Sequence, residues 1–557
     1  MKKFILNLLS VLFLFVFIAS CSKKDKTGLL IPKDAALVIH FNSPSFSSKL
    51  SWNDIKATNW FKKIYSESND SLAEKILNDP ASSGVDIKSD LVYFIKVKNN
   101  SSYLVFDGKL NDANSFESLC KKTISNGQVT KDGKFSSITK SDKAAITWNN
   151  NWFACVVNIQ NINLAGNFGR QNSPDLQSNV TADSLIKYGK EVLSLSDTKT
   201  LGVDDRFAGL IKETGDIHMW LNMEHLYSSG AMSMYMSMMK VSSLFEGNIY
   251  ASTINFDNGK IVLKGKHYEG EEMTKLLKKY PAQPLDASLI NRLPAENLMA
   301  AFAFNFQPES TNEFLKLTGL DGIINLMLAK ANLTLDDLIK ANKGQMIFAL
   351  NGIDTKKISD TTFIDGNKTP MVLTHERPQV KFLFADAVNN NPSFDKLMGL
   401  LKELLGKLKS EPTNITYQVK SNWFALGNQE NVDAFLSGNN NHVPFADQIS
   451  GHPLGGFIDI QKILNLVRGK IQDSSAMNIL NASMNLWQNV VMTGGEFSDG
   501  GVTFSMEINL VDKNTNSLKQ LNQYMDQLTT AYSKHFAFKQ GQMDHLMTDS
   551  PKQEDTK

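Results

Sequence analysis

Residues 104–119 read LVFDGKLNDANSFESL, and residues 382–397 read FLFADAVNNNPSFDKL. Both stretches open with three apolar residues, and both carry Ser-Phe, an acidic residue and a Leu at the same distance further on. The apolar opening fits a buried strand, whereas Phe394 begins a run of apolar residues at the i, i+3, i+4 spacing of a helix. The same strand-then-helix segment therefore occurs twice in one chain.

Four further pairs of short segments match in the same order along the chain. They are residues 31–42 with 293–305, residues 151–154 with 422–425, residues 207–211 with 445–449, and residues 256–259 with 497–500. One such match can arise by chance, but five in order indicate a duplication. The period of about 240 to 280 residues is too long for a solenoid repeat, so we expect two similar domains.

Each half combines hairpin signals with helical patterns. Apolar strands flank Asn-rich turns at residues 99–102 and 149–151, and Asn-Gly and Asp-Gly stand at residues 258–259 and 499–500. Both dipeptides suit the positive φ angles of type I′ hairpin turns. Together with the helical run of residues 394–408, these signals predict an α+β fold. We expect each half to be a mostly antiparallel sheet with helices packed on one face.

The two cysteines of the body fall on apolar positions of the repeat. The matches place Cys120 opposite Met398 and Cys155 opposite Leu426. Because unpaired cysteine is among the most buried residue types, both positions predict core packing. A Cys120–Cys155 disulfide is the alternative for an exported protein.

Two segments have no counterpart in the other half. They are residues 161–205 in the first half and residues 351–379 in the second, and the composition of the latter predicts a polar loop. Insertions in a duplicated scaffold often carry function, because the fold does not need them. Neutral drift of a loop explains them equally well, so both interpretations stay open.

The chain begins with a basic start and an apolar run. Residues 4–18 are almost unbroken apolar sequence, and they lead into Ile18-Ala19-Ser20-Cys21. The run is short for a spanning helix and has the parts of a secretory signal peptide. Its end resembles a bacterial lipobox, which implies that Cys21 becomes the acylated first residue. Acyl chains contribute roughly 0.8 kcal/mol per buried CH₂, so such a residue is a firm membrane anchor.

These signals divide the chain into six parts. They are a lipoprotein signal peptide at residues 1–20, the lipidated Cys and a tether at residues 21–29, a first repeat domain at residues 30–270, a linker at residues 271–292, a second repeat domain at residues 293–535, and a polar tail at residues 536–557. The linker carries Pro281 and Pro284, as connecting segments often do.

Composition agrees with an exported, folded body. Hydrophobic residues make up 42% of the chain and charged residues 21%, which is ordinary for a globular protein. The formal net charge is +1, and removal of Lys2 and Lys3 leaves about −1, so no basic excess indicates nucleic-acid binding. After the signal peptide, no apolar run reaches the ~20 residues of a spanning helix.

The familiar catalytic and nucleotide-binding motifs are absent from the sequence. It contains no P-loop, no dinucleotide-binding glycine motif, no His-Glu-x-x-His and no Gly-x-Ser-x-Gly. No catalytic residue and no cofactor can be assigned, and an enzyme is not favoured.

Two pairs of adjacent acids, Asp204-Asp205 and Asp336-Asp337, attract attention as possible acid/base groups. Neighbours in sequence do not establish a catalytic dyad. The second pair follows Thr334, which predicts that it supports a helix N-terminus.

The one unusual tract is MSMYMSMM at residues 232–239. On a helix, Met232, Met236 and Met239 share one face. Thioethers are soft ligands that suit Cu(I), so these three are weak candidate metal ligands. Methionine is also a flexible core filler and is favoured at adaptable contact surfaces. Packing within the domain or against a partner is therefore the main interpretation.

Several features together resemble a known family. They are the lipobox at residues 18–21, the opening IPKDA at residues 31–35, GDIHMW at residues 215–220, and the hairpin turn at residues 257–259. With these features the mature chain resembles uncharacterised Bacteroidetes lipoproteins, a duplicated domain-of-unknown-function family. The resemblance implies an envelope location in a diderm bacterium and assigns no activity.

The residues after Cys21 bear on the orientation. In such bacteria, acids directly after the lipidated Cys resemble a surface-export signal, whereas residues 22–26 hold one acid among three lysines. We therefore expect a lipoprotein anchored through Cys21 to the outer membrane, with the periplasmic face favoured over the cell surface.

The expected role is non-enzymatic: binding or holding an envelope protein or polymer. The alternatives are a hydrolase acting on envelope polymers and a copper-handling protein. The sequence names neither the partner nor the oligomeric state.

Overall fold

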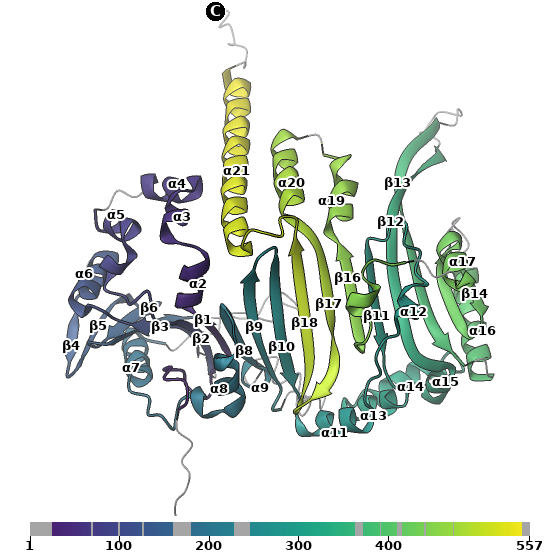
Figure 1. The fold of residues 1–557 in the computed structure, drawn as a ribbon, viewed down its shortest axis with the longest axis horizontal. Coiled ribbons are helices and arrows are strands. Elements are labelled where there is room, and N and C mark those ends of the chain that lie inside the picture. Colours follow the sequence, from purple (N-terminus) through teal and green to yellow (C-terminus); the bar gives the residue numbers. More distant parts are fainter. Residues whose placement is uncertain are drawn as a thin grey trace, which may run out of the picture. The chain divides into compact units, whose positions relative to one another are not determined.

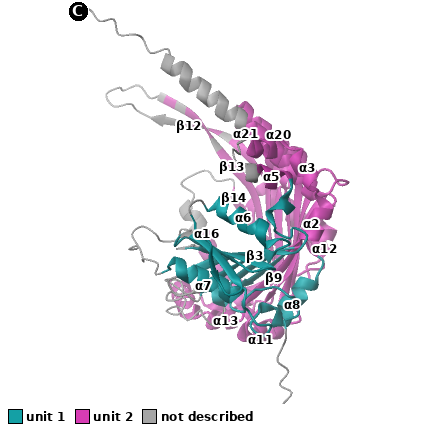
Figure 2. Cartoon of the chain, turned by 90° about the vertical axis from the view of Figure 1, so that its left-hand side faces the viewer, with its two compact units in different colours: residues 1–41, 79–214, 218–229 teal, residues 42–78, 215–217, 230–557 magenta. Residues whose placement is uncertain are grey.

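The computed structural model divides the chain into two compact units (Figure 2). Unit 1 comprises residues 1–41, 79–214 and 218–229, and unit 2 comprises residues 42–78, 215–217 and 230–557. The structure describes residues 25–67, 71–98, 101–124, 127–159, 180–227, 246–362, 371–389, 392–408, 415–438, 442–471 and 473–548. The units and the predicted repeats thus divide the chain at different places.

Unit 1 is built on a sheet with the strand order β8-β1-β2-β3-β7-β6-β5-β4. Strand β8 pairs with β1, and all the other pairs are antiparallel. The strands are β1 (Leu37–Phe41), β2 (Leu91–Lys98), β3 (Ser101–Lys109), β4 (Thr130–Asp132), β5 (Phe135–Ser141), β6 (Ala144–Trp148), β7 (Trp152–Asn158) and β8 (Ile217–Asn222). The helices are η1 (Pro80–Ser83), α6 (Ala113–Thr123), α7 (Ala182–Val192), η2 (Leu201–Val203), α8 (Asp205–Lys212) and α9 (Met223–Tyr227).

Helices cover both faces of the unit 1 sheet, not one face as expected. Phe116 of α6 packs against Trp148 of β6, whereas Gly189 of α7 lies against Thr147. Successive residues of a strand point to opposite faces, so α6 and α7 lie on opposite sides (Figure 1). Amphipathic spacing shows which side of a helix is apolar, but it does not show which face of a sheet that side will cover.

Unit 2 contains a fully antiparallel sheet with the strand order β9-β10-β18-β17-β16-β11-β12-β13-β15-β14. The strands are β9 (Ile249–Asp257), β10 (Lys260–Tyr268), β11 (Ala300–Asn305), β12 (Asn342–Thr362), β13 (Met371–Val388), β14 (Ile415–Lys420), β15 (Trp423–Asn428), β16 (Leu454–Asp459), β17 (Trp487–Ser498) and β18 (Gly501–Leu510). The predicted hairpins β2–β3, β6–β7, β9–β10 and β17–β18 are confirmed.

The helices of unit 2 come from both ends of the chain (Figure 1). They are α2 (Ser43–Lys49), α3 (Trp52–Lys56), α4 (Asn59–Glu67), α5 (Ser71–Asn78), α11 (Glu271–Lys279), α12 (Ala287–Ile290), α13 (Ser310–Leu317), α14 (Asp321–Ala329), α15 (Leu335–Ala341), α16 (Pro392–Leu408), α17 (Gln429–Ser437), α18 (Ala446–Ile449), α19 (Ile460–Arg468), α20 (Ser474–Leu486) and α21 (Ser517–Thr548). No helix within the described ranges is long and apolar enough to cross a bilayer.

The main core of unit 2 lies on one face of its sheet. Small residues of the central strands, such as Ala303, Ala349 and Ala385, are fully buried there. Phe435 of α17 and Ile290 of α12 pack into the same cluster. Small side chains on the sheet let these helices approach closely, and the helices add large apolar groups to those of the strands, such as Ile347 and Leu383.

Six strands follow the same order in both units. The order is β8-β1-β2-β3-β7-β6 in unit 1 and β16-β11-β12-β13-β15-β14 in unit 2. The registers also agree, because Phe106 faces Cys155 in the first sheet and Phe384 faces Leu426 in the second.

The insertion at residues 351–379 is not the polar loop that its composition predicted. Its described residues form the outer parts of β12 and β13, which pair from Gly352–Lys381 to Thr362–Met371. The break in register between Leu350 and Gly352 is a bulge, which bends the strand locally before the pairing continues. β-Branched and polar residues are mixed along this ribbon without regular alternation.

The predicted linker and tail contain helices. Residues 271–292 hold α11 and α12, and Leu289 of α12 is buried in the unit 2 core. Helix α21 runs through residue 535 to Thr548.

Candidate functional site

The site residues expected from the sequence fall outside the described residues. This applies to Cys21 and to the whole Met tract with Met232, Met236 and Met239. Their roles therefore stay predictions. Within the described ranges, no group of three or more His, Cys, Asp or Glu side chains is arranged to hold a metal ion.

A row of polar side chains crosses the covered face of the unit 1 sheet. Strand pairing aligns His40, Val92 and Asp107 on three neighbouring strands, and His218 lies beside His40. Exposed fractions are 3% for His40, 2% for His218 and 1% for Asp107. Polar groups at such depth are costly unless they are hydrogen-bonded, so their presence calls for a reason.

The two histidines form a directed hydrogen-bond chain. Their Nδ1 atoms lie 3.0 Å apart, and Nε2 of His218 lies 3.0 Å from the carbonyl oxygen of Glu213. Because a carbonyl only accepts, Nε2 of His218 carries a proton, and the Nδ1 of a neutral His218 accepts from His40. Nε2 of His40 lies 3.2 Å from Asp90 Oδ2, close enough for an ion pair but without hydrogen-bond alignment.

Asp107 is the residue of this row whose burial is the least compensated by hydrogen bonds. Neither of its carboxylate oxygens has a hydrogen-bond partner in the structure. Burial raises the pKa of Asp107 well above its ordinary value, so the neutral acid is the favoured form. The hydroxyl of Tyr188 on α7 is also buried without a partner, and its pKa is raised mainly by burial and in part by Asp107.

The same places in the unit 2 sheet hold small apolar residues. Gly455 and Ala303 pair where His218 and His40 lie in unit 1, and Ala385 occupies the place of Asp107. All three are buried. A sheet with this strand order therefore packs well without ionisable groups at these positions.

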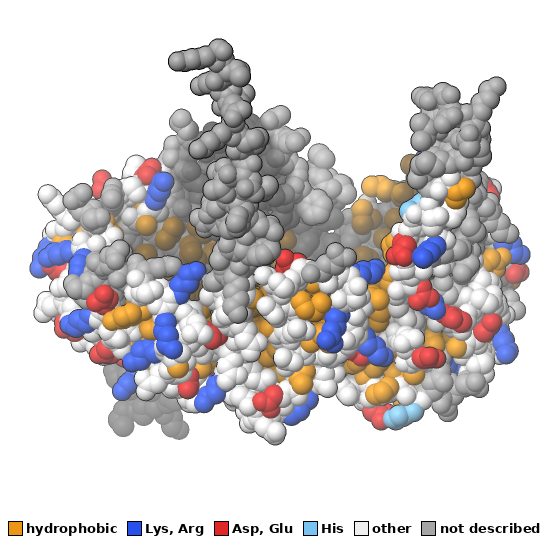
Figure 3. Space-filling model, turned by 90° about the horizontal axis from the view of Figure 1, so that it is seen from above, with side chains coloured by type: hydrophobic (Ala, Val, Ile, Leu, Met, Phe, Trp, Pro, Cys, Tyr) orange, Lys and Arg blue, Asp and Glu red, His pale blue; other side chains and the backbone are white. Residues whose placement is uncertain are grey.

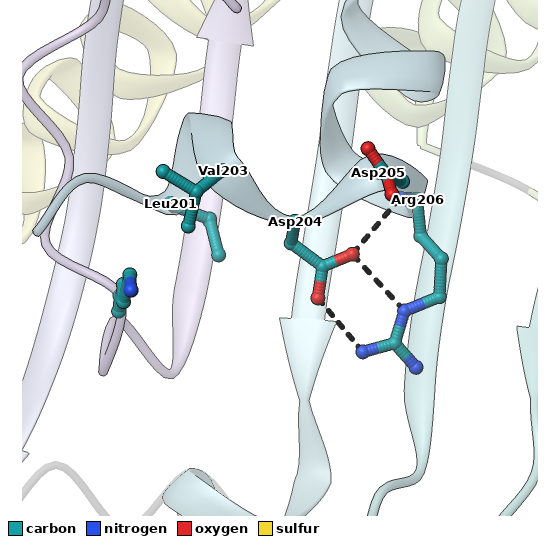
Figure 4. Close-up of a pocket in the computed structure, with 6 residues that line it drawn as sticks. Leu201, Val203, Asp204, Asp205 and Arg206 are labelled. Carbon is teal, nitrogen blue, oxygen red and sulfur yellow. Dashed lines mark hydrogen bonds and ion pairs between the residues drawn. The ribbon is translucent and has the colours of Figure 1, made fainter. Parts of the chain in front are cut away.

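A shallow pocket of about 460 Å³ lies elsewhere in unit 1, lined by Lys33, Leu201, Val203, Asp204, Asp205 and Arg206 (Figure 4). Asp204 caps α8 and holds Arg206 in a two-point ion pair, with distances of 3.1 and 2.8 Å. Although burial raises the pKa of Asp204, the hydrogen bonds from Arg206 lower it below the ordinary value. Asp205 pairs with Lys26. The adjacent acids thus point to separate cations and do not form an acid/base dyad.

The prediction for Asp336-Asp337 is confirmed. Thr334 and Asp337 form a reciprocal capping box at the start of α15. Hydrogen bonds from Lys396 and Thr334 lower the pKa of Asp337 well below its usual range. This carboxylate is structural.

Cys120 behaves as the core residue that was predicted, whereas Cys155 is only partly buried. Both are free, and Cys120 packs in the cluster beneath α6. Burial raises the pKa of Cys120 to about 12 and also raises the pKa of Cys155. Neither thiol is activated as a nucleophile.

The second face of the unit 2 sheet is apolar but exposed. Phe302, Phe304 and Phe348 on the neighbouring strands β11 and β12 are 39%, 41% and 41% exposed. The other positions of this face on β16, β11 and β12 are Leu454, Gly456, Ile458, Ala300, Met346 and Leu350. None of these side chains is charged. Figure 3 shows orange side chains gathered in its right-hand part, where Figure 1 draws β11 and β12.

Glycines on this face leave room for aromatic rings of the neighbouring strands. A Cβ on Gly456 would lie 2.9 Å from the Phe302 ring and 3.0 Å from the Met492 methyl group. A Cβ on Gly265 would meet the Phe504 ring at 2.8 Å. The rings therefore lie close to the backbone of the neighbouring strand. We call Phe302, Phe304, Phe348, Leu454 and Met492 the open apolar face.

A protein-family model matches residues 28–369, more than half of the chain, and its description is "Domain of unknown function (DUF4836)". The chain belongs to this family. No curated protein and no solved structure matches it. Membership of the DUF4836 family assigns no activity, so function has to be argued from the chain itself.

Sequence reasoning missed the polar row of this DUF4836 member, although the signal was available. The match of residues 36–42 with residues 299–305 places His40 opposite Ala303. The match of residues 104–119 with residues 382–397, which contains no gap, places Asp107 opposite Ala385. An ionisable residue opposite an alanine marks a position where the fold does not require polarity.

Proposed function

We propose that this protein is an envelope lipoprotein, anchored through Cys21 to the outer membrane of a Bacteroidetes cell and facing the periplasm. Its body consists of two copies of one α+β domain and binds an envelope protein without catalysis. The observation that carries the binding role is the open apolar face of unit 2.

Duplication is supported by topology, register and core packing. The six-strand order is shared, and Phe116–Phe153 and Phe394–Phe424 are ring contacts at matching places. The backbone hydrogen bond from Leu110 to Asn151 also has a counterpart, from Val388 to Asn422. Similar folds reached independently would have no reason to share these registers.

The binding role is supported by the composition of the open apolar face. Protein interfaces are enriched in aromatic residues and Met at their centre and are depleted in charge there. Phe302, Phe348 and Met492 fit that pattern. Exposed apolar side chains grouped on one rigid sheet are unusual on a monomer and mark interaction sites.

A hydrolase is the weaker alternative. It needs polar side chains that converge in a cleft open to substrate. His40 and His218 lie side by side, but Val92 on β2 separates His40 from Asp107, and all three polar residues are almost completely buried beneath α7 and α8. Copper handling rests only on the Met tract.

Substitution on the open apolar face tests the binding role. A Phe302→Ser/Phe348→Ser double variant should lose a partner that the wild type retains through membrane solubilisation and affinity isolation. We expect at least ~10-fold less partner, which corresponds to about 1.4 kcal/mol. Phe314→Ser on α13 is the matched control, because Phe314 is also 41% exposed but lies off the sheet. Equal retention by the double variant, or no partner for the wild type, would overturn the proposal.

A further inference from the structure

The first described residues of the chain are fixed on unit 1. The backbone N–H of Lys26 donates to the carbonyl of Gly202 at 3.2 Å, and its Nζ lies 2.5 Å from Asp205 Oδ1. The carboxylate of Asp25 accepts hydrogen bonds from Thr27 and from the N–H of Gly28. We call these contacts of residues 25–28 the tether clamp.

Burial and strand-like pairing continue the attachment. Leu29 and Ile31 are buried, and the carbonyl of Ile31 accepts from the N–H of Leu201 at 2.7 Å. Lys33 N–H donates to the carbonyl of Lys199 at 3.2 Å. The exposed Lys26–Asp205 ion pair contributes little, about 0–1 kcal/mol. The backbone bonds and the two buried side chains therefore hold the segment.

The clamp leaves a very short free tether. Four residue steps separate Cys21 from Asp25, and a fully extended chain spans at most about 3.6 Å per residue, or roughly 14 Å in all. Acyl chains on Cys21 would hold that residue at the bilayer surface. The clamp then cannot lie further than this from the lipid headgroups.

We propose that the surface formed by residues 25–33 and by the start of α8, with its pocket, faces the lipid headgroups. This inference rests on the proposed anchor at Cys21. It turns unit 1 toward the membrane with its α7–α8 side, because α8 packs through Phe207 on Trp220, on the sheet face that carries His218. Helix α6, on the opposite face, points away from the bilayer.

Charge does not supply this orientation. The cations Lys26, Lys33 and Arg206 are balanced by the anions Asp25, Asp204 and Asp205. Two of the cations are held in ion pairs on the surface itself. Polybasic segments contribute about 1 kcal/mol per residue at an anionic bilayer, and a balanced surface lacks that attraction. The length of the tether, not the charge of this surface, sets the distance.

Depth-dependent fluorescence quenching tests the orientation on the full lipidated protein. A fluorophore is placed by Lys33→Cys or, as control, by Lys121→Cys on α6. The protein is reconstituted in phosphatidylethanolamine/phosphatidylglycerol vesicles that contain a nitroxide-headgroup lipid. The unsubstituted protein measures background labelling of Cys120 and Cys155. We expect several-fold stronger quenching at position 33 than at position 121. Equal quenching at the two positions would overturn the inference.

Two changes, one to the tether and one to the tether clamp, test whether the short tether or an affinity of the protein surface for lipid holds position 33 at the bilayer. A twenty-residue Gly-Ser insertion after Lys24 should abolish the quenching at position 33. Gly202→Ala should weaken it, because the new Cβ would lie 1.7 Å from Asp25 Oδ1. Gly209→Ala is the matched control, since its Cβ would meet no atom within 4 Å. Quenching that survives the insertion would contradict the inference.

Fatty-acid labelling of Cys21 in the same preparation separates the two proposals. A protein that carries no label refutes the anchor and with it the proposed function. A labelled protein without quenching at position 33 refutes only the orientation.

Discussion

At the scale of single residues, the comparison of the two sheets shows which buried polar residues the strand order does not require. In the unit 2 sheet, the positions that match His40, Asp107 and His218 hold the buried apolar residues Ala303, Ala385 and Gly455. His40, Asp107 and His218 occupy the same places in unit 1 at the expense of desolvation. This strand order therefore does not require ionisable residues at these three positions.

Replacement of Asp107 by the unit 2 residue is expected to stabilise the protein. Asp107→Ala removes a buried acid without partners, worth about 1–3 kcal/mol in the free energy of unfolding. The reverse change, Ala385→Asp, should destabilise by a similar amount, about 1–3 kcal/mol, because it buries an acid without hydrogen-bond partners. Chemical denaturation followed by Trp fluorescence checks both. A destabilised Asp107→Ala would contradict this account and would reveal a bonding partner for the acid.

The stabilisation by Asp107→Ala should depend on pH. The folded pKa of Asp107 is raised, so the folded protein keeps a proton that the unfolded chain releases above the ordinary Asp pKa of 3.8. Wild-type stability should then fall by up to about 1.4 kcal/mol per pH unit, until the pH reaches the folded pKa. The wild type and Asp107→Ala should differ more at about pH 7 than at about pH 5. A constant difference would refute the assignment of a neutral acid.

Lipidation is a second prediction about a single residue. Cys21→Ala should abolish incorporation of a labelled fatty acid, because no other thiol stands at the end of the apolar run. Metabolic labelling followed by immunoprecipitation measures it, with Cys155→Ala as control. Label retained by Cys21→Ala would place the acyl group elsewhere.

At the scale of elements, strands were easier to predict than the faces that helices cover. The hairpins at residues 257–260 and 498–501 follow from Asn-Gly and Asp-Gly turns, and the helix at residues 392–408 follows from its apolar spacing. The ribbon at residues 352–381 could not be predicted this way. Among the described residues, these strands pair only with each other, and Val372 and Val380 are exposed. Their sequence lacks the regular apolar/polar alternation of a half-buried sheet strand.

The ribbon should be dispensable for folding. Joining Ile353 to Val380 through Asn-Gly would close the hairpin at a natural pair, as Asn258-Gly259 closes β9–β10. We expect the free energy of unfolding to change by less than about 1 kcal/mol, since shortening a loop affects closure entropy only slightly. Thermal or chemical unfolding measures this. A large loss of stability would show that the ribbon packs on the body.

The Met tract is predicted to act through apolar volume, not through sulfur. Changing Met232, Met236 and Met239 together to Leu conserves volume and should cost less than ~1.5 kcal/mol for each residue. Folding and partner binding should survive the triple change. Measuring the Cu(I) affinity of the purified wild type and of the triple variant distinguishes packing from metal binding. Tight binding that the change abolishes would favour the metal hypothesis.

At the scale of the whole molecule, the five sequence matches carried more information than any motif. They paired positions that turn out to share strand order and register, such as Trp152 with Trp423. They could not reveal the open apolar face. Phe302 and Phe348 follow the same alternation as buried strand residues, and sequence does not say which face of a sheet is left uncovered.

Photo-crosslinking in the native envelope tests the central claim, that this protein works by binding a partner on the open apolar face. A benzophenone amino acid replaces Phe348 on β12 or, for comparison, Phe314 on α13, two positions of equal exposure. Our account predicts a discrete crosslinked protein band from position 348 that is absent from position 314. No crosslinked protein from position 348, or the same bands from both positions, would contradict it.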